Sequence, residues 1–112
     1  MKISGNSIKS DGYAELRLSV SAAKTAAYTV VDTDDVVLVD TTSAAITVTI
    51  PSALIATPGY QVVIKDVGAA EGNNITIATE GSETVNGAAT GTIATTKAAM
   101  RLVSNGTNLF SI

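Results

Sequence analysis

The chain has 112 residues, with ten acidic and seven basic side chains and neither cysteine nor histidine. One hydrophobic core is all that this length supports, so the sequence predicts a single domain. The formal net charge of −3 at pH 7 argues against binding to nucleic acid or to anionic membranes, because both need a basic surface. Without cysteine the chain has no means of forming disulfides or thiolate metal sites.

The first twelve residues contain mostly serine, glycine, asparagine and lysine around two isolated isoleucines, Ile3 and Ile8. Such a segment is too polar to build a core alone, and we interpret residues 1–12 as an arm or an edge strand. It lacks the apolar central run of a signal peptide, and no stretch of the chain approaches the roughly 20 apolar residues of a membrane-spanning helix. We therefore expect a protein that is assembled without secretion and has no membrane partner.

Beyond this arm, apolar residues recur with the period of two that is typical of β-strands. At residues 13–20, YAELRLSV, the alternation predicts a half-buried strand with a charged outer face. Residues 35–40, DVVLVD, are apolar at four successive positions, which indicates a strand covered on both faces, by its own domain or by another subunit. Pro51 ends a strand, and residues 51–59 fit one helical turn or a loop. Further strands are predicted at residues 28–31, 45–50, 60–66, 75–78, 90–94, 97–104 and 107–112.

The strongest local signal is Asn105-Gly106, because both residues tolerate positive φ and fit a two-residue primed hairpin turn. Such a turn leaves Phe110 and Ile112 on the face opposite Leu102, where they need separate cover. A one-residue slip would instead put all three on one face. Both registers fit the sequence.

About eight or nine short strands, with turn signals roughly every 8 to 12 residues and no convincing helix, predict an all-β fold. We expect a single β-sandwich or jelly-roll-like domain at residues 13–112, preceded by the N-terminal arm at residues 1–12. Its core is expected to consist of Val, Ile and Ala, because the chain has three Tyr, one Phe and no Trp. The outer strand faces are rich in Thr, Ser and Ala and weakly charged, which is typical of proteins that pack side by side.

The sequence offers little for catalysis. Since histidine and cysteine are absent, imidazole bases, thiol nucleophiles and the common zinc sites are excluded. Glu71, Glu80 and Glu83 are candidates for the carboxylate pair of a glycosidase, but they lie in glycine-containing turns with no aromatic sugar platform nearby. We therefore predict that the protein is not an enzyme.

A cluster of aspartates is the candidate metal site. Hard cations such as Ca²⁺ need several carboxylate oxygens close together. The spacing of this cluster does not match an EF-hand loop, and acids beside a strand are commonly solvated turn residues. We therefore predict neither a metal site nor a cofactor. The cluster consists of Asp32, Asp34, Asp35 and Asp40.

Several segments form a recognisable series when they are taken in order. They read AAYTVVDTDDVVLVDTTSAAITVTIPSA, GYQVVIKDVG, NNITIATEGSETVNGAAT and AMRLVSNGTNLFSI. In this order they resemble a β-domain that recurs in bacteriophage virion proteins, both in tail fibres and in small head-associated proteins. The resemblance covers residues 26–112, although Leu109 stands where the family usually has an aromatic residue, commonly tryptophan. It implies a structural domain, often trimeric, without catalytic residues.

Two classes of function are compatible with this resemblance. The first is a virion structural protein, either a capsid decoration (cement) protein or a short tail-fibre or head-fibre component. The second is a carbohydrate-binding module for host attachment, which would need exposed aromatic platforms, whereas Tyr13, Tyr28 and Tyr60 lie on predicted strands. Because the chain begins at Met1 and is nearly all one domain, we expect a small stand-alone decoration protein present in many copies.

The expected partners are the major capsid protein or another virion protein, together with further copies of this chain in a homotrimer. The expected location is the virion, assembled in the host cytoplasm. Apolar strand faces favour self-association, since the core of an interface is depleted in charged residues. Capsid or partner contacts are predicted at Lys2, Ile3, Ile8 and Lys9, and subunit contacts at Val37, Val39, Phe110 and Ile112.

Overall fold

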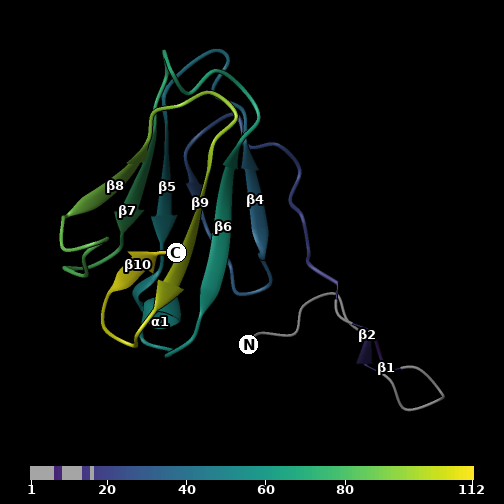
Figure 1. The fold of residues 1–112 in the computed structure, drawn as a ribbon, viewed down its shortest axis with the longest axis vertical. Helices are drawn as coiled ribbons and strands as arrows, with labels where there is room; N and C mark the ends of the chain where they lie inside the picture. Colours follow the sequence, from purple (N-terminus) through teal and green to yellow (C-terminus); the bar gives the residue numbers. More distant parts are fainter. Residues whose placement is uncertain (1–6, 9–13, 16) are drawn as a thin grey trace.

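The computed structural model describes residues 7–8, 14–15 and 17–112 of the chain. Within these residues the fold is β-rich with almost no helix, as the sequence predicts (Figure 1). Sheet 1 has the strand order β10-β9-β6-β4, sheet 2 has the order β3-β5-β7-β8, and a two-stranded hairpin, β1-β2, precedes them. The elements are β1 (Ser7–Ile8), β2 (Ala14–Glu15), β3 (Tyr28–Thr29), β4 (Val36–Val39), β5 (Ile46–Ile50), α1 (Ser52–Ile55), β6 (Gln61–Asp66), β7 (Ile75–Thr79), β8 (Thr90–Ile93), β9 (Ala99–Ser104) and β10 (Leu109–Ser111).

From β3 to β7 the chain crosses to the other sheet after each strand. Neighbouring strands within a sheet are therefore two apart along the chain, and the pairs β3-β5, β5-β7 and β4-β6 are parallel. The last three strands, β8, β9 and β10, join their sheets antiparallel. Parallel neighbours need a long crossover connection, and here that connection runs through the opposite sheet. A jelly roll, in contrast, is built from antiparallel strands.

The core lies between the two sheets and follows from the alternation along each strand. In sheet 2, Val48 and Ile77 are fully buried, and in sheet 1, Val37 and Ile64 belong to the same buried cluster. Valine and isoleucine make up most of this cluster, which confirms the expected core composition. Burial of one such side chain contributes roughly 1.5 to 3 kcal/mol, so the cluster is the main stabilising element of the fold.

The stretch at residues 13–20 differs from the predicted half-buried strand. Its described strand is β2, which pairs with β1 and not with either main sheet. Leu18 and Val20 are 63% and 59% exposed, so these apolar residues do not join the core. Val20 instead bridges Val36 at the edge of sheet 1. Alternation predicts that one face of a strand is apolar, but not which surface that face meets.

Strands β9 and β10 form the predicted hairpin with a longer loop than expected. Leu109 pairs with Ser104, so a four-residue loop takes the place of the two-residue turn. Asn105 Oδ1 accepts hydrogen bonds from the backbone N–H groups of Thr107 and Asn108, at 3.0 and 2.9 Å. The asparagine therefore acts through its side chain, and the positive φ of the loop, 95°, belongs to the glycine that follows it.

The observed register also decides which hairpin side chains share a face. It is shifted by two residues from the register of the predicted turn, and a shift of two preserves the face of every side chain. Phe110 and Ile112 therefore lie on the face opposite Leu102, and the one-residue slip is excluded. Leu102 is fully buried, whereas Phe110 and Ile112 are exposed on the side of sheet 1 that is turned away from the core.

Candidate functional site

The predicted subunit contacts fall into two groups. Val37 and Val39 have no exposed surface and belong to the core of this chain. Their side chains cannot reach another subunit, so the interface prediction is corrected at these two positions. Successive residues of a strand point to opposite faces, and in β4 it is Val36 and Leu38 that point outward.

Phe110 and Ile112 do lie at the surface, with 39% and 67% of their area exposed. The backbone N–H of Ile112 donates to the carbonyl of Arg101 at 2.9 Å, which places Ile112 beside Arg101 on the neighbouring strand. Both hydrophobic side chains are therefore accessible to another molecule. That they form a subunit interface stays a prediction.

Most of the predicted arm contacts lie outside the described residues. This applies to Lys2, Ile3 and Lys9, and to the expected boundary between residues 12 and 13. Ile8 lies in β1, where its backbone pairs with that of Ala14. Figure 1 shows the β1-β2 hairpin set apart from the two main sheets.

Cross-strand pairing brings aliphatic side chains into one row on sheet 1. Val20 pairs with Val36, and Val36 pairs with Val63. Val63 in turn pairs with Arg101, whose other neighbour is Ile112. Directly paired residues put their side chains on the same face of a sheet, so this row runs across the whole width of sheet 1.

We define the outer face of sheet 1 as the surface made by Val20, Val36, Leu38, Gln61, Val63, Lys65, Arg101, Val103, Phe110 and Ile112.

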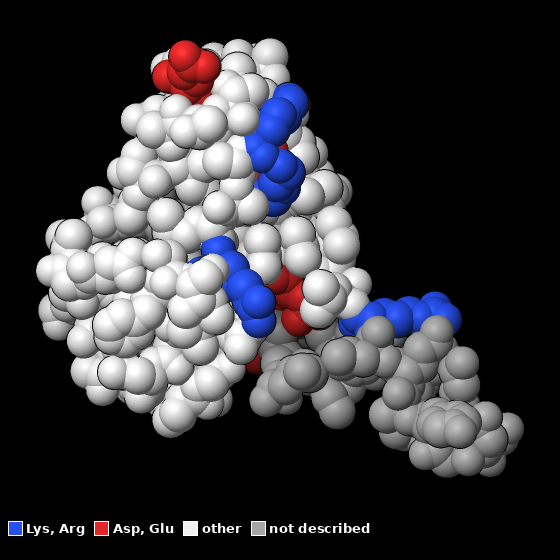
Figure 2. All heavy atoms as spheres, in the orientation of Figure 1, with Lys and Arg blue, Asp and Glu red and all other residues white. Residues whose placement is uncertain are grey.

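Charged groups on the outer face of sheet 1 are sparse and engaged with neighbours. Arg101 Nε and Nη2 donate to Gln61 Oε1 at 3.3 and 3.0 Å. Lys65 Nζ donates to the backbone carbonyl of Lys97. Figure 2 views this side of the molecule and shows mostly uncharged surface with a few basic and acidic side chains. Seven of the ten residues of this face are apolar, and an apolar-rich surface with few charges is typical of protein contact sites.

The carboxylate of Asp66 holds together loops at one end of the sheets. Asp66 has no exposed surface. It accepts hydrogen bonds from the Thr41 hydroxyl (2.8 Å) and from the N–H groups of Gly68, Ala70 and Lys97 (3.1, 3.2 and 2.9 Å). Burial alone raises the pKa of Asp66, but these hydrogen bonds, with that from Lys97 the largest, hold the pKa below its usual value. The group therefore stays ionised at neutral pH.

Sequence reasoning missed Asp66, although the sequence contains a signal for it. In β6, Val62 and Ile64 point into the core, and Asp66 is the next residue with the same period of two. An acid at a core-facing position where a strand ends indicates a buried polar contact with the adjoining loops. Its donors all belong to this chain, so we interpret the Asp66 network as a structural clamp.

The predicted aspartate cluster is not assembled into a metal site in the part of the chain that the structure describes. Asp34 Oδ2 accepts a hydrogen bond from the Tyr28 hydroxyl at 2.6 Å. Asp35 Oδ2 accepts one from a backbone N–H at 2.8 Å, and Asp40 Oδ1 accepts from groups of its own loop. Asp32 is exposed. The carboxylates of Asp34, Asp35 and Asp40 thus stabilise the loops around β3 and β4.

The tyrosines are engaged within the fold. Tyr60 is buried in the core, as its strand position predicts, and Tyr28 is half-buried. Lys24 Nζ lies 4.3 Å from the centre of the Tyr28 ring. Burial, followed by the hydrogen bond to Asp34, raises the pKa of Tyr28 to about 12. Tyr13 lies outside the described residues.

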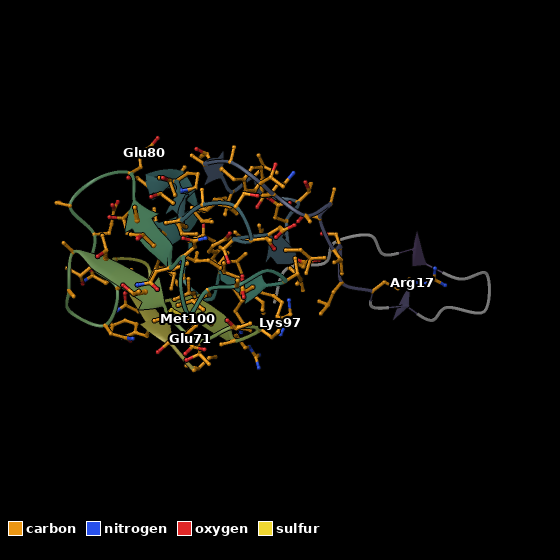
Figure 3. All side chains as sticks on the ribbon, turned by 90° about the horizontal axis from the view of Figure 1, so that it is seen from above. Arg17, Glu71, Glu80, Lys97 and Met100 are labelled. Carbon is orange, nitrogen blue, oxygen red and sulfur yellow. The ribbon has the colours of Figure 1, made fainter. Side chains whose placement is uncertain are left out.

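Of the three glutamates considered for a glycosidase pair, Glu80 and Glu83 lie beside the same serine, Ser52, whereas Glu71 lies apart. Figure 3 shows Glu71 and Glu80 on opposite sides of the molecule. Glu80 Oε1 accepts a hydrogen bond from the N–H of Ser52 at 3.1 Å. Glu83 accepts one from the hydroxyl of the same serine. Glu80 and Glu83 therefore share helix α1 as a neighbour, and Glu71 belongs to the far end of the fold.

No protein-family model matches this chain, and a search of curated proteins finds no significantly similar sequence. Among the residues that the structure describes, no helix has the length and apolar composition needed to cross a membrane. Function is therefore inferred from the residues and their geometry.

Proposed function

We propose that this protein is a non-enzymatic structural component of a bacteriophage particle, namely a capsid decoration (cement) protein that binds the outer shell as a homotrimer and stabilises it. The observation that supports this proposal best is the apolar, weakly charged outer face of sheet 1. The proposed partners are the major capsid protein or another virion protein, and further copies of the chain. No nucleic acid, membrane or cofactor takes part, and the proposed location is the virion.

The chemistry of the outer face of sheet 1 suits a contact with another subunit. Single exposed apolar residues are normal on any protein, whereas several of them on one sheet face favour a contact site. Ile112 and Val20 stand at the two edges of this row, and between them lie the half-buried Val36 and Val63 and the exposed Arg101. Covering apolar area contributes about 25 cal/mol per Å² removed from water, so burial of the apolar side chains of this face favours association.

We also propose the finer fold class, a β-sandwich of two sheets around one core. The single cluster of buried residues draws on both sheets, which supports this class. The parallel pairs favour a sandwich over a jelly roll. Such a two-layer domain suits a cement role, because a decoration protein stiffens a shell only when the domain itself resists deformation.

Light scattering of the purified chain tests the trimer. We expect a trimeric mass at micromolar concentration, and a monomeric mass for the double variant Phe110→Ser and Ile112→Ser, with the melting temperature of the isolated domain retained. The control is Val31→Ser, because Val31 is 50% exposed but follows β3 of sheet 2. A wild-type chain that stays monomeric both in solution and on particles would contradict the proposal.

Mass spectrometry of purified particles tests the location. A copy number comparable with that of the major capsid protein is the expected result for a decoration protein. A few copies found at the tail alone would contradict decoration and would favour a short tail-fibre component.

A further inference from the structure

A pocket of about 330 Å³ lies at the end of the molecule that carries helix α1. It is bounded by α1, by residues 82–83 and by the β9-β10 loop at residues 106–108. Asp66 ends β6 at the opposite end of the sheets, so the pocket is distinct from the Asp66 clamp (Figure 1). Ligand pockets typically measure about 300 to 1,000 Å³, and a volume at the small end of this range suits a single sugar ring.

Glu83 is the charged group of this pocket. Its carboxylate accepts a hydrogen bond from the Ser52 hydroxyl, and Oε1 accepts one from the N–H of Gly81 at 3.0 Å. These hydrogen bonds, that from Ser52 foremost, hold the pKa of Glu83 below its usual value, so the group is ionised at neutral pH. The backbone N–H of Glu83 also donates to its own carboxylate, and a carboxylate offers about four acceptor positions, so these three donors do not saturate it.

Asn108 supplies the complementary donor. Its Oδ1 accepts a hydrogen bond from the N–H of Thr84 at 2.8 Å, which orients the amide. The amide nitrogen carries two further N–H donors, and none of the described residues accepts from them. Ser82 and Thr107 line the same pocket, and a hydroxyl can both donate and accept.

We propose that this pocket binds one neutral saccharide unit, with Glu83 accepting from a sugar hydroxyl and Asn108 donating to a second sugar oxygen. Sugar hydroxyls both donate and accept, so they match a site that presents an acceptor, an amide donor and two hydroxyls. An anion is repelled by the Glu83 carboxylate. A cation offers only hydrogen-bond donors, so it leaves the N–H donors of the Asn108 amide without an acceptor. This assignment does not depend on the virion role proposed above.

The affinity follows from what lines the pocket. Its exposed apolar lining is limited to Ala56, because Ile55 is fully buried, and no aromatic side chain lines it for stacking. We therefore expect weak binding, with a Kd on the order of 1 mM. An affinity of that order becomes effective when many copies present the same pocket to a multivalent glycan.

Nuclear magnetic resonance titration of the isotope-labelled full chain tests this site. The probes are glucose, galactose, mannose and N-acetylglucosamine, each added to tens of millimolar. At least one is expected to shift backbone amide signals of residues 52–56, 81–84 and 105–108. Glu83→Gln is expected to weaken that binding roughly tenfold, because a charge-assisted hydrogen bond is lost. The control is Glu71→Gln, which makes the same charge change at the other end of the fold and leaves the affinity unchanged.

A second variant covers the case in which Glu83→Gln does not fold. Ser82→Leu narrows the pocket mouth at an exposed position and is expected to abolish the shifts. If none of the four sugars shifts these amides, or if the folded variants bind as the wild type does, the proposal is wrong. Methylammonium chloride is the further probe, since shifts caused by methylammonium but by no sugar would identify a cation pocket and overturn the assignment.

Discussion

Asp66 has no exposed surface and accepts hydrogen bonds from four donors, so a replacement there leaves buried donors without an acceptor. In Asp66→Asn an NH₂ group faces N–H donors in place of one carboxylate oxygen. We expect the free energy of unfolding to fall by about 3 kcal/mol. Urea denaturation of Asp66→Asn and of the exposed control Asp32→Asn measures this difference. Equal losses in the two variants would contradict the role assigned to Asp66.

Asp66 is also expected to make the stability of the protein depend on pH. The pKa of Asp66 lies below its usual value of 3.8 in the folded protein, so the unfolded chain binds more protons in acid. The stabilisation is complete above about pH 5 and is lost as the pH falls through the lowered pKa. We expect the free energy of unfolding of the wild type to decline below about pH 5, and that of Asp66→Asn to decline less steeply. If the free energy of unfolding falls equally steeply with pH in the two proteins, the lowered pKa of Asp66 is not the cause.

At the level of elements, the loop after β6 has no room for a side chain at Gly68. A Cβ built there would lie 2.3 Å from the backbone nitrogen of Thr41, and backbone atoms cannot yield as a flexible side chain can. We expect Gly68→Ala to lower the free energy of unfolding by about 3 kcal/mol. The matched control is Gly72→Ala in the same loop, where the nearest contact of an added Cβ is at 4.0 Å. Thermal unfolding that is indistinguishable for the two variants would be evidence against this packing.

Substitution of Asn105 distinguishes the four-residue β9-β10 loop from the two-residue turn that the sequence predicts. Asn105 Oδ1 accepts hydrogen bonds from two N–H groups, so Asn105→Gly is expected to cost about 1 to 2 kcal/mol. Asn105→Asp keeps an acceptor oxygen and serves as the control, with stability close to that of the wild type. Calorimetric melting of the Asn105→Gly and Asn105→Asp variants measures both stabilities. A two-residue primed turn tolerates glycine at this position, so an unchanged stability in Asn105→Gly would speak for that turn.

At the level of the whole molecule, the buried core begins at Val30 and ends at Leu109. Deletion of residues 1–12 is therefore expected to leave the melting temperature of the domain nearly unchanged. If these residues anchor the protein to a shell, as we propose, the truncated chain will show lower occupancy on particles by quantitative mass spectrometry. Full occupancy after truncation would rule out the arm as the anchor, and a collapse of the melting temperature would show that the arm belongs to the domain.

Much of the local structure could be derived from the sequence alone. The strands β4, β5 and β6 fall within predicted ranges, because short apolar runs, alternating or continuous, and rich in β-branched residues are a property of consecutive residues. The β9-β10 hairpin follows from the Asn105-Gly106 signal between two apolar segments, whereas the faces of its side chains were fixed only by the observed register, because two registers fit the sequence. The composition of the core follows from the amino acids available. These features need no information about distant parts of the chain.

The remaining features depended on the three-dimensional fold, because they arise between residues far apart in sequence. Any apolar strand face can pack on any other, so alternation does not reveal that β4 lies parallel to β6 or that the chain changes sheet after each strand. A strand that is apolar on both faces, such as β4, carries no sign of which valines point inward, so the sequence predicts interface contacts for Val37 and Val39, which the fold buries in its core. The Asp66 clamp collects its donors from residues 41, 68, 70 and 97, and such a set exists only once the loops that carry those residues meet.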